Sequence, residues 1–139
     1  MRRSFLTDNW IGNSGQCALR CREVIAELLK RFGKLNGVVN NARIPSLGMP
    51  ESCDDIPWRK FLAINQEGTV FGSRYGLDAI LKSREPGSII GLSSTAAIKG
   101  YTAHHAYAAM KGAVIGHHTG DFRDARLFGN QIDLGLIRK

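Results

Sequence analysis

The chain has 139 residues, of which 43% are hydrophobic and 22% charged, a composition typical of one folded domain rather than of a disordered protein. Nineteen basic and twelve acidic residues give a net charge of +7. These charges are scattered, however, and no aromatic-basic interleaving favours nucleic-acid binding. No apolar run reaches the ~18 residues that span a bilayer, and the first residues lack the apolar stretch of a signal peptide. We therefore expect a cytoplasmic protein that binds neither nucleic acid nor membrane.

Cysteine and histidine spacing does not favour a metal site. The residues concerned are Cys17, Cys21, Cys53, His104, His105, His117 and His118. Zinc sites need ligand pairs that this spacing does not supply. We expect no metal, reduced and partly buried thiols, and histidines at the surface.

The first predicted element is a helix over residues 21–32, since residues 1–20 show no pattern that assigns them to an element. Its apolar face carries Val24, Ile25, Leu28, Leu29 and Phe32, and Gly33 follows in the capping position. Next, "LNGVVNN" at 35–41 is a short apolar run, typical of a strand that is covered on both faces.

An acidic pair and a proline, Asp54, Asp55 and Pro57, predict the start of a second helix, which runs to "FLAIN". Residues 68–84 carry a further helical stripe and end at the turn "EPGS".

The rest of the chain repeats the alternation. "SIIGLSS" at 88–94 predicts a second buried strand, residues 104–128 a helix, and 131–137 a short extended piece. Strands that alternate with helices predict an α/β fold with a parallel sheet and helices on both faces. Ligands of such sheets bind at the carboxyl ends of the strands, so Asn41 and Ser94 should face a site.

The stretch "AYAAMKGAV" places Tyr107 four residues before Lys111 within the predicted helix. Positions four apart share a helical face, so the phenol and the ammonium should lie together. A phenol ionises near pH 10 in water, and a neighbouring ammonium stabilises the phenolate. The pair is a plausible acid/base unit, although many helices carry this spacing.

Three further motifs accompany this pair. Ser94 lies thirteen residues before Tyr107, Asn65 ends "FLAIN", and "GVVNNA" spans 37–42. In this order and spacing the motifs resemble the short-chain dehydrogenase/reductase family over residues 21–128. The resemblance implies a partial Rossmann-like, doubly wound sheet. It also implies hydride transfer between NAD or NADP and a secondary alcohol or ketone.

The resemblance implies a role for each matching residue. Tyr107 would exchange a proton with the substrate oxygen, while Lys111 would favour the phenolate and hold the nicotinamide ribose. Ser94 would hydrogen-bond the substrate oxygen; Ser93 is its rival, but the thirteen-residue spacing favours Ser94. Asn65 would anchor a water that relays protons from Lys111. The residues implied to contact the cofactor are Asn41, Ala42, Tyr107, Lys111, Gly135 and Ile137.

Some of the family's features are missing. The family's glycine-rich phosphate turn, Thr-Gly-x-x-x-Gly-x-Gly, does not occur, Arg43 replaces the last glycine of Asn-Asn-Ala-Gly, and Leu134 replaces a proline. We interpret 1–139 as one incomplete domain in which 1–20 is unassigned and 21–139 is family-like. The strand in "LNGVVN" is then expected to be an unpaired edge.

Two functional hypotheses follow. The first is an oxidoreductase that acts on an alcohol or ketone. The second is a catalytically inactive remnant that serves as an interaction module. Gly112, Gly116 and Gly120 suggest close helix–helix approach, and the family resemblance implies a homo-oligomer through the helices at 67–82 and 104–128.

Overall fold

The computed structural model describes residues 14–45, 48, 51, 54–120 and 131–137. The elements in chain order are α1 (Ser14–Phe32), β1 (Gly37–Asn40), α2 (Asp55–Leu62), the π-helical segment η2 (Ala63–Glu67), α3 (Gly68–Ser83), β2 (Ser88–Ser94), α4 (Ala96–Lys99), α5 (His105–Gly120) and β3 (Gln131–Ile137). The predicted alternation of helices and strands is thus confirmed. Residues 121–128 of the predicted last helix lie outside the described residues.

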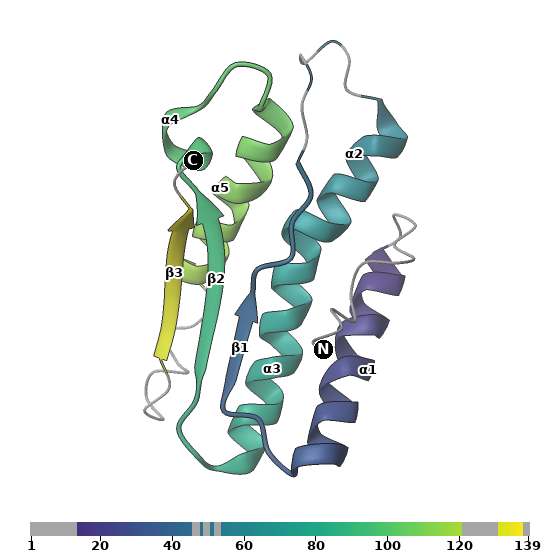
Figure 1. Cartoon of the computed structure of the whole chain (residues 1–139), viewed down its shortest axis with the longest axis vertical. Coiled ribbons are helices and arrows are strands. Elements are labelled where there is room, and N and C mark those ends of the chain that lie inside the picture. The colour runs from purple at the N-terminus through teal and green to yellow at the C-terminus, as the bar shows by residue number, and fades with distance from the viewer. Residues whose placement is uncertain (1–13, 46–47, 49–50, 52–53, 121–130, 138–139) are drawn as a thin grey trace, which may run out of the picture.

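The three described strands form one parallel sheet in the order β1-β2-β3 (Figure 1). Val38 pairs with Ile89 across β1 and β2, and Ile90 pairs with Asp133 across β2 and β3. The parallel α/β sheet agrees with the prediction. Helices on both faces are not found among the described residues at β2, because Ile89, which packs against α3, and Gly91, which packs against α5, are two residues apart and share one face. In the described sheet, β1 is an edge strand, as expected.

Helices α3 and α5 pack against the sheet through alternate residues of the strands. Ile89 of β2 clusters with Ile80 of α3, while a side chain at Gly91 would meet the ring of His118 on α5. Val39, which lies between Val38 and Asn40 on β1, points to the opposite face of the sheet and is 61% exposed. The prediction that this strand is covered on both faces is therefore wrong for Val39, since no described element packs over it.

The first helix is longer than predicted and ends where predicted. It begins at Ser14 and closes at Gly33, which adopts a φ of 75° and donates its N–H to the Leu29 carbonyl at 2.8 Å. Phe32, predicted on the apolar face, is 68% exposed. Periodicity defines a stripe on a helix, but a residue of the last turn is buried only where another element reaches it.

The two predicted middle helices form one continuous run, α2–η2–α3, and α1 packs beside α3 (Figure 1). The run begins after Asp54, which has the extended backbone of an N-cap but makes no side-chain capping hydrogen bond. It ends at Arg84, whose left-handed φ of 56° reverses the chain toward β2. None of the described helices is both long and apolar enough to cross a membrane.

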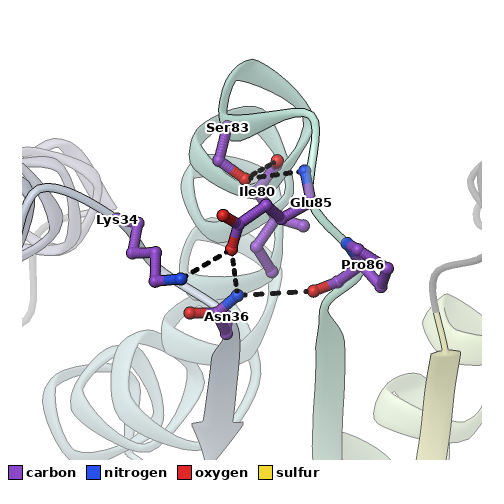
Figure 2. A network of polar contacts seen from close by, with 6 residues as sticks. All are labelled: Lys34, Asn36, Ile80, Ser83, Glu85 and Pro86. Atoms are coloured by element: carbon purple, nitrogen blue, oxygen red, sulfur yellow. Dashed lines mark hydrogen bonds and ion pairs between the residues drawn. The ribbon is translucent and has the colours of Figure 1, made fainter.

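Polar contacts join the segments that lead into β1 and β2 (Figure 2). Lys34 Nζ lies 2.8 Å from Glu85 Oε2, and Asn36 Nδ2 donates to the same oxygen at 3.2 Å. Asn36 also donates to the Pro86 carbonyl at 3.5 Å. These contacts fix the amino ends of the two strands relative to each other.

Candidate active site

Asn65 lies inside the π-helical segment η2, rather than at a helix end as predicted. Its side chain is fully buried and holds both backbone polar groups of Ile44: Oδ1 accepts the N–H, and Nδ2 donates to the carbonyl, each at 3.0 Å. Nδ2 also lies 3.9 Å from Met110 Sδ. Asn65 therefore ties the segment that follows β1 to α5. Single π-helical turns often occur at functional sites.

Two free thiols of α1 contact the backbone at the ends of η2. Cys17 Sγ donates to the Ala63 carbonyl at 3.4 Å, and Cys21 Sγ to the Gly68 carbonyl at 4.0 Å. Cys17 is buried and Cys21 half-buried, as the sequence predicts. The contacts connect α1 to the segment that carries Asn65.

Tyr107 and Lys111 lie together on α5, as their spacing predicts. Tyr107 is 4% exposed and Lys111 is fully buried. The Lys111 ammonium lies 6.0 Å from the centroid of the Tyr107 ring and donates to the Leu92 carbonyl at 2.6 Å. The pair thus faces the carboxyl half of β2, away from bulk water.

The surroundings of Lys111 disfavour its charged form. Burial, and then the positive charge of Arg43, lower the pKa of Lys111 from 10.5 to about 8. An ammonium that titrates near neutrality can gain or lose a proton at little cost. Groups tuned in this way concentrate at functional sites.

The two candidate serines differ in their contacts. Ser93 Oγ donates to the Lys111 carbonyl at 2.6 Å, so this hydroxyl is used to hold α5 against β2. Ser94 Oγ accepts the Ala96 N–H at 3.2 Å, and among the described residues it makes no second hydrogen bond. Both side chains are buried. Ser94 thus has a hydroxyl proton to offer a ligand, whereas Ser93 does not.

The implied cofactor contacts lie in two places. Asn41 and Ala42 are exposed and form part of the wall of a cavity of about 280 Å³, together with apolar residues of α1, β1 and η2. Gly135 and Ile137 lie in β3, paired with Leu92 and Ser94. The parallel register therefore brings the end of β3 beside the end of β2. The side chains of β3 lie outside the described part of the chain.

Three features were not predicted. Arg43 acts on Lys111 by its charge, which no local spacing could indicate. His118 is buried against Gly91, so the surface assignment is wrong for this histidine. At Gly112 and Gly116 an added methyl group would meet nothing within 4 Å. No described helix approaches α5 there, and an oligomer through this face stays a prediction.

Comparison with known proteins identifies the family. A profile described as "short chain dehydrogenase" matches residues 17–123. A 2,5-dichloro-2,5-cyclohexadiene-1,4-diol dehydrogenase of Sphingobium indicum is 33% identical over 96 residues, which are 68% of this chain and 38% of that protein. An NADP-dependent (R)-specific alcohol dehydrogenase of Lentilactobacillus kefiri is 39% identical over 83 residues, or 60% of this chain and 33% of that protein. The match thus covers between a third and two fifths of the length of these relatives.

The fold is shared with solved structures. A metagenomic short-chain oxidoreductase in complex with NADP superimposes with a TM-score of 0.78 at 23% identity, over 91% of this chain and 56% of the other. The profile match, which extends from α1 through α5, and the conserved architecture lead to one assignment. The chain belongs to the short chain dehydrogenase family.

Proposed function

We propose that this chain carries the acid/base site of an NAD(P)-dependent dehydrogenase that interconverts a secondary alcohol and a ketone. The observation that supports this function best is the burial of Tyr107 beside the Lys111 ammonium, which is held 2.6 Å from the Leu92 carbonyl. A buried phenol beside a titratable ammonium can deliver a proton to a carbonyl oxygen and take it back from an alcohol.

Each residue has a distinct role in the proposal. Tyr107 donates its hydroxyl proton to the substrate oxygen during reduction, and Lys111 stabilises the phenolate that remains. Ser94 donates a hydrogen bond to the same oxygen and orients it. Asn65 is a positioning residue, because both ends of its amide hold Ile44. That Asn65 also anchors a relay water stays a prediction.

The residues present fit a nicotinamide cofactor in part. The cavity of about 280 Å³ runs along β1 from Leu35 to Ala42, so it offers space that reaches the carboxyl end of this strand. Gly135 and Ile137 would approach the carboxamide from β3. The cofactor, when bound, supplies or accepts the hydride.

A titration of the purified chain with NADH and NADPH, followed by cofactor fluorescence, tests this function. We expect a Kd below about 1 mM for one of them, which corresponds to a binding free energy of about 4 kcal/mol or more. Lys111→Met should abolish binding, whereas Lys60→Met, at an exposed lysine of α2, should not. Absence of binding by both cofactors would overturn the proposal.

A second candidate is an inactive family member that acts as an interaction module. The open face of α5 at Gly112 and Gly116 favours it. This reading predicts a homo-oligomer through α3 and α5 and no response to either cofactor. Light scattering of the wild type and of Gly116→Gln tests the interface, because the substitution would break an interface on α5. The cofactor titration distinguishes the two candidates.

A further inference from the structure

Three aromatic side chains are in contact, one after another, between α4 and the first turn of α5. The rings of Tyr101 and His104 have centroids 6.2 Å apart and an interplanar angle of 65°, and the rings of His104 and Tyr107 have centroids 6.5 Å apart and an angle of 72°. Aromatic pairs favour this edge-to-face arrangement at centroid distances of about 4.5–7 Å. We call the three residues Tyr101, His104 and Tyr107 the aromatic wall.

The aromatic wall leads from the surface to the buried phenol of the candidate site. Tyr101 is 50% exposed, His104 is half-buried and Tyr107 is 4% exposed. The Tyr101 hydroxyl and Thr95 Oγ1 share a hydrogen bond at 3.3 Å, and Thr95 directly follows Ser94. One end of the wall is therefore fixed beside Ser94, and the other end is Tyr107 itself.

The backbone between Tyr101 and His104 is held in an unfavourable conformation. Ala103 has a left-handed φ of 60°, which brings a side chain too close to the backbone. Its carbonyl accepts the Gly48 N–H at 3.0 Å, and His104 Nδ1 lies 2.9 Å from the Thr102 carbonyl. Backbone strain of this kind is concentrated at ligand-binding and active sites. We infer that the turn is kept because it brings the His104 ring against Tyr107.

We propose that the aromatic wall selects the substrate, and that it favours a ketone or alcohol with an aromatic ring on the oxygen-bearing carbon. The proposal rests on the proposed function for the place of the oxygen, between Tyr107 and Ser94. A ring attached to that carbon packs against the exposed ring of Tyr101, because Tyr101 is tied to the chain beside both residues. An aliphatic group of the same size gains apolar contact there but not the attraction between two aromatic rings.

An NMR titration of the backbone amides of the whole chain with two ketones tests the wall without turnover. Acetophenone and cyclohexyl methyl ketone are similar in size and differ in the aromaticity of the ring. We expect acetophenone to shift the amide signals of Tyr101 and Tyr107 and to bind about two- to tenfold more tightly, the range for one aromatic pair. Tyr101→Leu should remove this preference, whereas Tyr101→Phe should keep it.

The matched control is Tyr75→Leu, the same substitution at a tyrosine of α3 that stacks on Phe71, and it should keep the preference for acetophenone. Circular dichroism confirms that the variants are folded. Three results would overturn the role of the wall: the wild type binds neither ketone, it binds both equally tightly, or the two leucine variants lose the preference to the same extent.

The same measurements separate the wall from the dehydrogenase proposal. A preference for acetophenone that Tyr101→Leu removes, in a chain that binds neither NADH nor NADPH, would support the wall as a ligand-binding surface and overturn the dehydrogenase proposal. Reduction of both ketones at equal kcat/KM, with equal affinity for the two, would support the dehydrogenase and overturn the wall.

Discussion

The two ends of the parallel sheet carry polar contacts of very different kinds. At the amino ends, Lys34, Asn36 and Glu85 form a network whose ion pair is about half-exposed on both sides (Figure 2). At the carboxyl ends, Asn65 and Lys111 are fully buried, and each is held by backbone carbonyls. The first arrangement is screened by water and the second is not.

The comparison shows at which end of the sheet the polar contacts matter more for stability. A buried amide or ammonium is costly unless its hydrogen bonds are made, whereas an exposed ion pair contributes little either way. Substitutions should therefore have large effects at the carboxyl end and small ones at the amino end. Four substitutions test this gradient.

The largest effect is expected for Tyr107→Phe, which removes the proton donor but keeps the aromatic ring of this residue of α5. The rate of ketone reduction should fall about 10²- to 10⁴-fold, as expected for loss of a general acid. Cofactor affinity should change much less than the rate, because the aromatic ring remains. Tyr75→Phe, on α3 and stacked on Phe71, is the matched control and should leave the rate as it is. Equal rates in the two variants would remove Tyr107 from the mechanism.

Asn65→Ala should have the largest effect on stability. It leaves the N–H and the carbonyl of Ile44 without their partner, which costs about 1–3 kcal/mol. Urea unfolding measures this loss. Gln66→Ala, at the next position of η2, is the control. If Asn65→Ala lost less unfolding free energy than Gln66→Ala, the Asn65 amide would not be what holds the segment after β1.

Gly76→Ala tests the packing midway between the two ends. A methyl group there would lie 2.6 Å from Val38 Cγ2, and valine cannot rotate away easily because it is β-branched. Overpacking should outweigh the gain in helix propensity, with a net loss of about 1 kcal/mol. Gly112→Ala, where the methyl group meets nothing within 4 Å, should instead stabilise the chain. Thermal unfolding should show a lower melting temperature for Gly76→Ala and a higher one for Gly112→Ala.

Lys34→Gln should have the smallest effect. The hydrogen bonds from Lys34 and Asn36 lower the pKa of Glu85. The contact therefore stabilises the fold at pH values above the usual carboxyl pKa. This stabilisation is lost as the pH falls through the lowered pKa of Glu85. High salt should remove the difference between variant and wild type. If Lys34→Gln were still less stable than the wild type in high salt, the contact at the amino ends of the strands would not be screened by water.

The fold could be predicted from the sequence because its signals are local. Runs such as "SIIGLSS" indicate buried strands, and the four-residue spacing placed Tyr107 and Lys111 on one face of α5. The burial of His118 could not be predicted. It depends on Gly91, which is distant in the chain and leaves room for the ring.

The site was predicted only in part, for a related reason. Motif spacing located Asn65, but the π-helical turn and the hold on Ile44 arise from contacts between segments. Spacing also favoured Ser94 over Ser93, but the physical reason, the hydrogen bond from Ser93 to the Lys111 carbonyl, is a contact between segments. Charges that act through space, such as that of Arg43, leave no periodic signal.

The central claim is that Lys111 is a desolvated cation within the site. Its pKa in the folded chain, about 8, lies below the ordinary 10.5. Between these pH values the unfolded chain binds more protons than the folded one, so this group makes the fold more stable as pH rises from 8 to 10.5. The urea concentration at the midpoint of unfolding should therefore gain a contribution from Lys111 that increases from pH 8 to 10.5.

The most direct test is an NMR titration of the Lys111 side chain, assigned by comparison with Lys111→Met. We predict a midpoint near pH 8, well below the ordinary lysine value of 10.5. A midpoint near 10.5 for Lys111 would show that its ammonium is solvated, and would contradict the proposed site.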